Sequence, residues 1–203
     1  MHKKLFIFDL DGVLVEACDW HRDALNESLK ETADYCISQE DHINIFNGIP
    51  TKIKLQILSE WGIIESNQHD KINQLKQRKT IEIINQKAFL RQEKVELMDE
   101  IINLGHHLAC YTNSIKQTAT LMLEKTGILN KFEIVLTNQD VVSPKPSPEG
   151  YIYLIDRFGV NRGDCYIIED SPKGIEAAML SGANVIQVRN ADEVTLQNLR
   201  SLL

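Results

Sequence analysis

Cysteine and long apolar runs are scarce in this sequence, and each scarcity excludes a class of protein. The 203 residues include four cysteines, with neither CxxC spacing nor the density of a disulfide-stabilised secreted domain. We therefore expect reduced thiols in a cytoplasmic protein. No apolar run approaches the roughly 20 residues of a membrane span, and the first run ends at Asp9, too early for a signal peptide. The cysteines, which we expect to pack as small apolar side chains, are Cys18, Cys36, Cys110 and Cys165.

Basic residues are also fewer than acidic ones. The chain has 22 Lys and Arg against 29 Asp and Glu, which gives a net charge of −7 and an isoelectric point near 5.4. Nonspecific binding to nucleic acid needs clustered positive charge, so nucleic acid is not expected as a partner. With 43% hydrophobic residues, the chain is long enough to bury a core and to hold one domain with a smaller second one.

Five short apolar segments lack strict alternation, which is typical of strands buried on both faces. Helical segments between them end before a glycine suited to the left-handed cap position. This alternation predicts an α/β fold with a doubly wound parallel sheet. The predicted strands are 4–8, 108–112, 134–137, 165–169 and 185–188, and the predicted helices are 95–104, 115–125, 148–158 and 171–180.

The interval from residue 16 to residue 87 shows helical periodicity and no convincing strand. We predict an all-helical cap domain at 16–87, inserted into an α/β core domain formed by 1–15 and 88–203. The insertion follows the first strand directly, so the loop after that strand is also the hinge between the two domains.

Asp9 and Asp11 occupy that loop, and Gly12 lets the backbone turn after them. Residues two apart in an extended chain point to the same side, and ligands of open α/β sheets bind at the carboxyl ends of the strands. Two close carboxylates repel each other unless a cation or a proton is shared between them. Mg²⁺ suits such oxygen ligands. Solvated turn acids are the alternative interpretation of this pair.

Polar residues also follow two other predicted strands. Thr112, Asn113 and Ser114 bring hydroxyls and an amide able to hydrogen-bond an oxyanion, and Glu169 and Asp170 bring two more acids. Each group taken alone is also compatible with a helix N-cap.

Lys145 lies between Pro144 and Pro146, where backbone φ is restricted, as suits a charge that must be aimed. A surface turn lysine is the alternative. Together with the strand-end residues it forms a set typical of phosphoryl transfer. In that hypothesis Asp9 is the nucleophile and Asp11 the general acid and base. Lys145 and Thr112 bind phosphoryl oxygens, and Mg²⁺ is held by Asp9, the Asp11 carbonyl and Asp170.

Four stretches, FDLDGVL, YTNS, SPKPSPEGY and IIEDSPKGIEAAMLSGA, resemble the four ordered motifs of the haloacid dehalogenase (HAD) superfamily, in the branch with a helical cap after the first motif. The resemblance implies a Rossmann-like core, the roles just given, and Glu169 as a further acid of the metal site. It implies that Gly12, Asn113 and Ser114 belong to the substrate-binding site. It also argues against a true dehalogenase, which lacks the second acid, and it allows a cis Lys145–Pro146 peptide.

Two cap residues resemble functional positions of β-phosphoglucomutase-like members. His21 corresponds to a histidine that orients the acid/base aspartate, and Lys79 to a cap lysine. Surface positions on charged helix faces are the alternative for both. The loop at 47–51 departs from the mutase pattern, with Thr51 where an arginine would bind a second phosphate, and Lys52 adjacent.

The sequence favours Mg²⁺-dependent hydrolysis of a small phosphorylated metabolite in the cytoplasm, with the cap closing over the substrate. A β-phosphoglucomutase-like phosphosugar mutase is the alternative enzyme. A non-catalytic binding protein is the alternative class, against which the presence of Asp9 and Lys145 argues. We expect a monomer or a weak homodimer, and no membrane partner.

Overall fold

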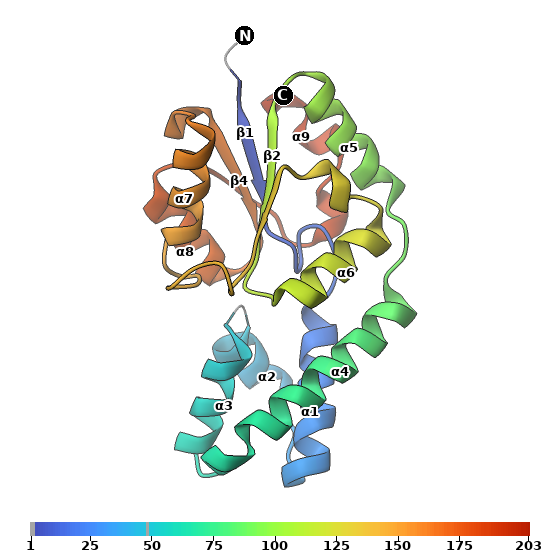
Figure 1. The fold of residues 1–203 in the computed structure, drawn as a ribbon, viewed down its shortest axis with the longest axis vertical. Coiled ribbons are helices and arrows are strands. Elements are labelled where there is room, and N and C mark those ends of the chain that lie inside the picture. The colour runs from blue at the N-terminus through green and yellow to red at the C-terminus, as the bar shows by residue number, and fades with distance from the viewer. Residues whose placement is uncertain (1–2, 48) are drawn as a thin grey trace.

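The computed structural model describes residues 3–47 and 49–203, and it contains one parallel sheet (Figure 1). The strands lie in the order β3-β2-β1-β4-β5. From the central β1 the chain builds β2 and β3 on one side, then returns to the other side to build β4 and β5. This confirms the predicted doubly wound parallel sheet. The strands are β1 (Leu5–Phe8), β2 (His107–Tyr111), β3 (Ile134–Leu136), β4 (Cys165–Glu169) and β5 (Asn184–Gln187).

Helices cover both faces of the sheet (Figure 1). Along β1, Phe6 and Phe8 pack into the core on one face, while Leu5 and Ile7 pack into the core on the other. All four side chains are fully buried, which explains why this strand is apolar without alternation. One face carries α5 (Gln92–Asn103), α6 (Lys116–Thr126) and α9 (Leu196–Leu199), and the other carries α7 (Glu149–Phe158) and α8 (Pro172–Ser181).

The segment after β1 is helical and lies beyond the carboxyl ends of the strands (Figure 1). Within the described residues of 16–87 it contains no strand. It has an apolar core of its own, which includes Leu25, Leu29, Phe46, Leu58 and Ile72. Its helices are α1 (Cys18–Ala33), α2 (Gln39–Asp41), a π-helical turn (His42–Phe46), α3 (Thr51–Glu60) and α4 (His69–Lys87).

The base of this helical segment also packs on the sheet. Ala17 and Ile84 belong to the apolar core that covers one face of the sheet. The domain division at 15/16 and 87/88 therefore stays a prediction. Gly48, in the predicted loop 47–51, lies outside the described residues.

None of the described helices is long and apolar enough to cross a membrane. All four cysteines are free.

Candidate active site

The loop after β1 brings both predicted acids to one cavity. Asp9 follows β1 directly, and its backbone N–H donates to the carbonyl of Ile168 in β4 at 3.0 Å. Gly12 has a φ of +89°, and a Cβ at this position would lie 2.2 Å from Asp170 Oδ2. Glycine is therefore needed here for the backbone conformation and for the close approach of Asp170. The structure places Gly12 against that carboxylate, and Gly12 is not among the residues that line the cavity.

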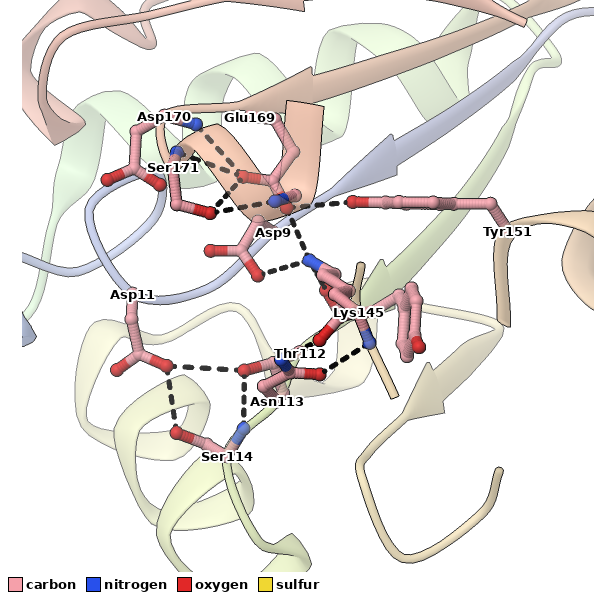
Figure 2. Close-up of polar contacts among 12 residues, drawn as sticks. Asp9, Asp11, Thr112, Asn113, Ser114, Lys145, Tyr151, Glu169, Asp170 and Ser171 are labelled. Carbon is pink, nitrogen blue, oxygen red and sulfur yellow. Dashed lines mark hydrogen bonds and ion pairs between the residues drawn. The ribbon is translucent and has the colours of Figure 1, made fainter. Parts of the chain in front are cut away.

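Lys145 is buried between two carboxylates (Figure 2). Its Nζ donates to Asp9 Oδ1 at 2.7 Å, to the Tyr111 carbonyl at 2.9 Å and to Glu169 Oε1. Burial alone would lower the pKa of Lys145, but the charges of Asp9 and Glu169 raise it well above its usual value. The Lys145–Pro146 peptide is cis.

Asn113 fixes the loop that carries Lys145. Its Nδ2 donates to the Lys145 carbonyl at 3.1 Å, and the Lys145 backbone N–H donates to Asn113 Oδ1 at 3.1 Å (Figure 2). The amide that we predicted as an oxyanion donor therefore also positions the ammonium, while remaining at the edge of the cavity.

Glu169, at the end of β4, is fully buried and surrounded by donors. Tyr151 Oη donates to its Oε1 at 2.9 Å. Its Oε2 accepts from the backbone N–H groups of Asp170 and Ser171, at 3.0 and 3.2 Å, and from Ser171 Oγ at 3.2 Å. Glu169 thus holds Lys145 in place. A metal ion bound to Glu169, as predicted, would have to compete with these hydrogen bonds.

The carboxylates of Asp9, Glu169 and Asp170 fit a divalent cation. Each offers an oxygen within 4.8 Å of the others. Asp170 Oδ1 is buried and has no hydrogen-bond partner in the described part of the chain. Burial raises the pKa of Asp9 well above its usual value, and burial together with the charge of Glu169 raises the pKa of Asp170 to about 7. A bound cation would reduce the repulsion between these carboxylates. Mg²⁺ prefers hard oxygen donors of this kind.

Asp11 has the opposite environment (Figure 2). Its carboxylate accepts from Ser114 Oγ at 2.8 Å, from Thr112 Oγ1 at 3.2 Å and from His21 Nε2 at 2.9 Å. Burial alone would raise the pKa of Asp11, but the imidazole and the two hydroxyls outweigh it and lower the pKa to about 2. Thr112 and Ser114, predicted as phosphate ligands, therefore also hold Asp11 in its ionised form.

His21 reaches the site from α1. Lys76 of α4 donates from Nζ to His21 Nδ1 at 3.0 Å. Since an ammonium has no acceptor, Nδ1 is the unprotonated nitrogen and Nε2–H faces Asp11. Burial and the charge of Lys76 lower the pKa of His21, in keeping with a neutral ring.

The structure does not bring Lys79 to this site. Its Nζ pairs with Glu27 at 3.2 Å and with Glu31 at 3.5 Å, two acids four residues apart on α1. It is absent from the lining of the cavity, where Lys76 lies instead. Both lysines fall on one helical face with Ile72, so periodicity alone could not choose between them.

The cavity between the sheet and the helical segment has a volume of about 200 Å³. It brings together eight predicted residues: Asp9, Asp11, His21, Thr112, Asn113, Ser114, Lys145 and Asp170. The helical segment also contributes Thr51, Lys52, Lys54 and Lys76. Neither Lys54 nor Lys76 was predicted, because no motif in the sequence distinguishes them from the other lysines of the helical segment.

Comparisons with known proteins agree with this geometry. Residues 6–188 match the family model described as haloacid dehalogenase-like hydrolase. The chain is 29% identical over 187 residues to the fructose-1-phosphate phosphatase YqaB of Escherichia coli, covering 90% of this chain and 95% of that one. The fold is similar to a crystal structure of β-phosphoglucomutase from Clostridium difficile, with a TM-score of 0.83, 18% identity and coverage of 99% and 97% of the two chains. It is also similar to a structure of CbbY from Rhodobacter sphaeroides in complex with xylulose-1,5-bisphosphate, with a TM-score of 0.80, 20% identity and coverage of 92% and 86%.

The family match spans most of the chain and all four strand ends that build the cavity. The chain belongs to the haloacid dehalogenase-like hydrolase family.

Proposed function

We propose that this hydrolase is a Mg²⁺-dependent phosphatase that cleaves a small phosphomonoester through an aspartyl-phosphate on Asp9. The observation that carries the proposal is the contrast between two carboxylates facing one cavity. Asp9 Oδ1 lies 2.7 Å from the Lys145 ammonium and belongs to the acid cluster that fits a divalent cation, whereas Asp11 lies outside that cluster and accepts from an imidazole and two hydroxyls. The Lys145 ammonium and a bound cation favour the ionised form of Asp9 that a nucleophile needs, and the neighbours of Asp11 hold it where it can exchange a proton with the leaving oxygen.

In the first step an oxygen of Asp9 attacks phosphorus, and the bond from phosphorus to the substrate oxygen breaks. The leaving oxygen takes a proton from Asp11. The negative charge of the incoming phosphate raises the pKa of Asp11, so that this carboxylate takes up the proton that it delivers. Lys145 Nζ, 2.7 Å from Asp9 Oδ1, is placed to bind the oxygens of the phosphoryl group.

In the second step Asp11 removes a proton from a water molecule, whose oxygen attacks phosphorus. The bond to Asp9 breaks, inorganic phosphate leaves, and Asp9 is restored as a carboxylate. Asp9 and Asp170 would hold Mg²⁺, which when bound would reduce the repulsion between the nucleophile and the phosphate. The hydrogen bonds from His21 and Ser114 return Asp11 to its ionised form once phosphate has left.

The similarity to a fructose-1-phosphate phosphatase and the cavity of about 200 Å³ support a compact phosphorylated metabolite as substrate. The helical segment covers the acids and restricts bulk water. A cytoplasmic monomer or weak homodimer stays our prediction. A phosphosugar mutase is the alternative, favoured by the contact between His21 and Asp11 and opposed by Thr51 in place of an arginine.

The test is phosphate release from a panel of phosphorylated metabolites, with Mg²⁺ and with chelator. It compares the wild type with Asp9→Asn and with Asp156→Asn, which alters an exposed acid on α7. We expect chelator-sensitive release that Asp9→Asn abolishes and Asp156→Asn retains. Undiminished release by Asp9→Asn would contradict the proposal. Conversion of a sugar phosphate to its isomer in the presence of its bisphosphate, with little free phosphate, would favour the mutase.

A further inference from the structure

Two lysines of the helical segment line the cavity without a carboxylate partner. Lys54, in the first turn of α3, is 8% exposed, and its Nζ takes part in no hydrogen bond or ion pair within the described residues. Lys76 Nζ contacts the neutral ring of His21 at 3.0 Å and forms no ion pair there. Both charges therefore lie in a cavity wall with no counter-charge beside them.

Other shielded lysines of this chain are compensated. Lys145 lies between Asp9 and Glu169. Lys94, which is fully buried, donates to the carbonyls of Ala191 and Val194. Lys79 is paired with two glutamates on α1. Lys54 and Lys76 thus stand apart because neither forms an ion pair within the described residues, and the more distant charge of Asp11 does not outweigh the effect of burial on either pKa.

An ammonium buried without a partner destabilises a fold, and two such groups near each other repel. Burial, followed by the charge of Lys76, lowers the pKa of Lys54 to about 7, and burial lowers the pKa of Lys76 to about 8. An anion seated between them would supply the missing counter-charge.

The wall around Lys54 is suited to an anion in a second way. The ten-residue helix α3 begins at Thr51, so the partial positive charge of its first turn faces the same cavity. The Thr51 side chain and the amide of Asn73 line this wall as further polar groups. The carboxylates of the cavity, Asp9, Asp11 and Asp170, come from the strand ends on the opposite wall.

We propose that Lys54 and Lys76 bind a second anionic group of the substrate, a phosphate or carboxylate carried by the leaving group and separate from the phosphate that Asp9 attacks. This inference rests on the proposed phosphatase function and narrows its substrate class. The preferred substrates are phosphorylated acids or bisphosphates, which span the cavity from the acidic wall to the lysines. Phosphomonoesters of neutral alcohols leave the lysines without a counter-ion.

The experiment compares kcat/KM within two matched substrate pairs. Phosphoglycolate against 2-hydroxyethyl phosphate tests a carboxylate, and fructose 1,6-bisphosphate against fructose 1-phosphate tests a second phosphate. Wild type is expected to prefer the anionic member of at least one pair, and that pair identifies the anion. Lys54→Met should lower the preference by about 10- to 100-fold, the range of a hydrogen bond to a charged group. Lys54→Arg should retain most of it.

Two controls separate ligand binding from folding. Lys71→Met removes an exposed lysine of α4 and should leave the preference unchanged. Lys54→Met should also unfold at higher urea concentration than wild type, because an apolar side chain replaces an unpaired buried charge. Selectivity that falls while stability rises is a result that a purely structural lysine would not give.

Failure of this inference is distinguishable from failure of the phosphatase. If 2-hydroxyethyl phosphate or fructose 1-phosphate is hydrolysed but neither pair shows a preference, or if Lys54→Met keeps the preference, the second anion site is wrong and the phosphatase stands. If neither these four compounds nor the metabolite panel release phosphate, the phosphatase is wrong. In that case, calorimetric titration of the same substrate pairs into Asp9→Asn, with and without Lys54→Met, tests the second anion site by binding alone. Tighter binding of the anionic member that Lys54→Met removes supports the site, and equal affinities for both members of each pair overturn it.

Discussion

Replacing Lys145 with methionine should destabilise the fold strongly, because it leaves two buried carboxylates without their cation. Asp9 is 6% exposed and Glu169 is 0% exposed, and Lys145, at 3%, is the cation that touches both. Breaking a buried ion pair on one side costs about 3–5 kcal/mol, since the remaining charge stays desolvated. For a chain of this length that loss corresponds to a fall in Tm of roughly 6–20 °C.

The size of this loss should depend on pH in a defined direction. The Lys145 charge opposes the rise in the pKa of Asp9, so that pKa rises further in the variant. The folded variant then binds a proton at pH values where the unfolded chain, with a carboxyl pKa near 3.8, has lost it. Stability therefore falls as pH rises above about 4, and the variant should lose more at pH 8 than at pH 5.

Urea unfolding of wild type, Lys145→Met and the exposed control Lys71→Met, in chelator at pH 5 and pH 8, measures both effects. A second variant, Lys145→Met with Glu169→Gln, removes one of the stranded charges. It should recover at least about 1 kcal/mol relative to Lys145→Met alone. A loss at pH 8 below about 1 kcal/mol, or a loss equal at the two pH values, would refute the account of this buried cluster.

Three further perturbations test other parts of the site. His21→Ala should lower kcat about 10- to 100-fold. It should also move the acid limb of the pH–rate profile to higher pH, because the pKa of Asp11 rises from about 2 towards its ordinary value. An acid limb at the same pH in the variant would contradict the role of His21 in keeping Asp11 ionised. Without metal, wild-type stability should fall as pH rises from about 4 to 7, because folded Asp170, with a pKa of about 7, keeps a proton that the unfolded chain releases. Asp170→Asn should flatten that slope in pH-dependent urea unfolding and reduce the Tm gain from Mg²⁺ at pH 8, and an equal gain in both proteins would argue against the metal assignment. Gly174→Ala, whose Cβ would lie 1.9 Å from the buried carboxylate at the end of β4, should cost about 1–3 kcal/mol in urea unfolding, whereas Gly163→Ala, with nothing within 4 Å, should change stability by less than about 0.5 kcal/mol.

The sheet and its acids could be predicted because parallel strands impose a common edge. Once β1, β2 and β4 were placed in one sheet, Asp9, Thr112 and Asp170 had to meet at their carboxyl ends, whatever lay between them in sequence. The four-residue helix α9 was missed because so short a segment carries less than two turns of periodicity.

The cap residues could not be placed in the same way. Helices of the insert share no edge, and the height at which α4 crosses α1 decides which lysine meets His21. Lys76 does so, and Lys79 meets glutamates instead. Lys54 gave no signal in the sequence because its burial and its lack of a partner are visible only in three dimensions.

Partners, more than burial, separate the roles of the lysines in this protein. Lys145, Lys94 and Lys54 are all more than nine-tenths buried. Two carboxylates raise the pKa of Lys145, and backbone carbonyls accept hydrogen bonds from Lys94. Burial, followed by the charge of Lys76, lowers the pKa of Lys54 to about 7, and Lys54 forms no ion pair within the described residues. A charge that the fold compensates can be retained for structure alone, whereas an uncompensated one lowers stability and needs another reason to persist. The opposite wall of the cavity holds our proposed phosphate site, and the second anion that we propose on the same substrate supplies that reason.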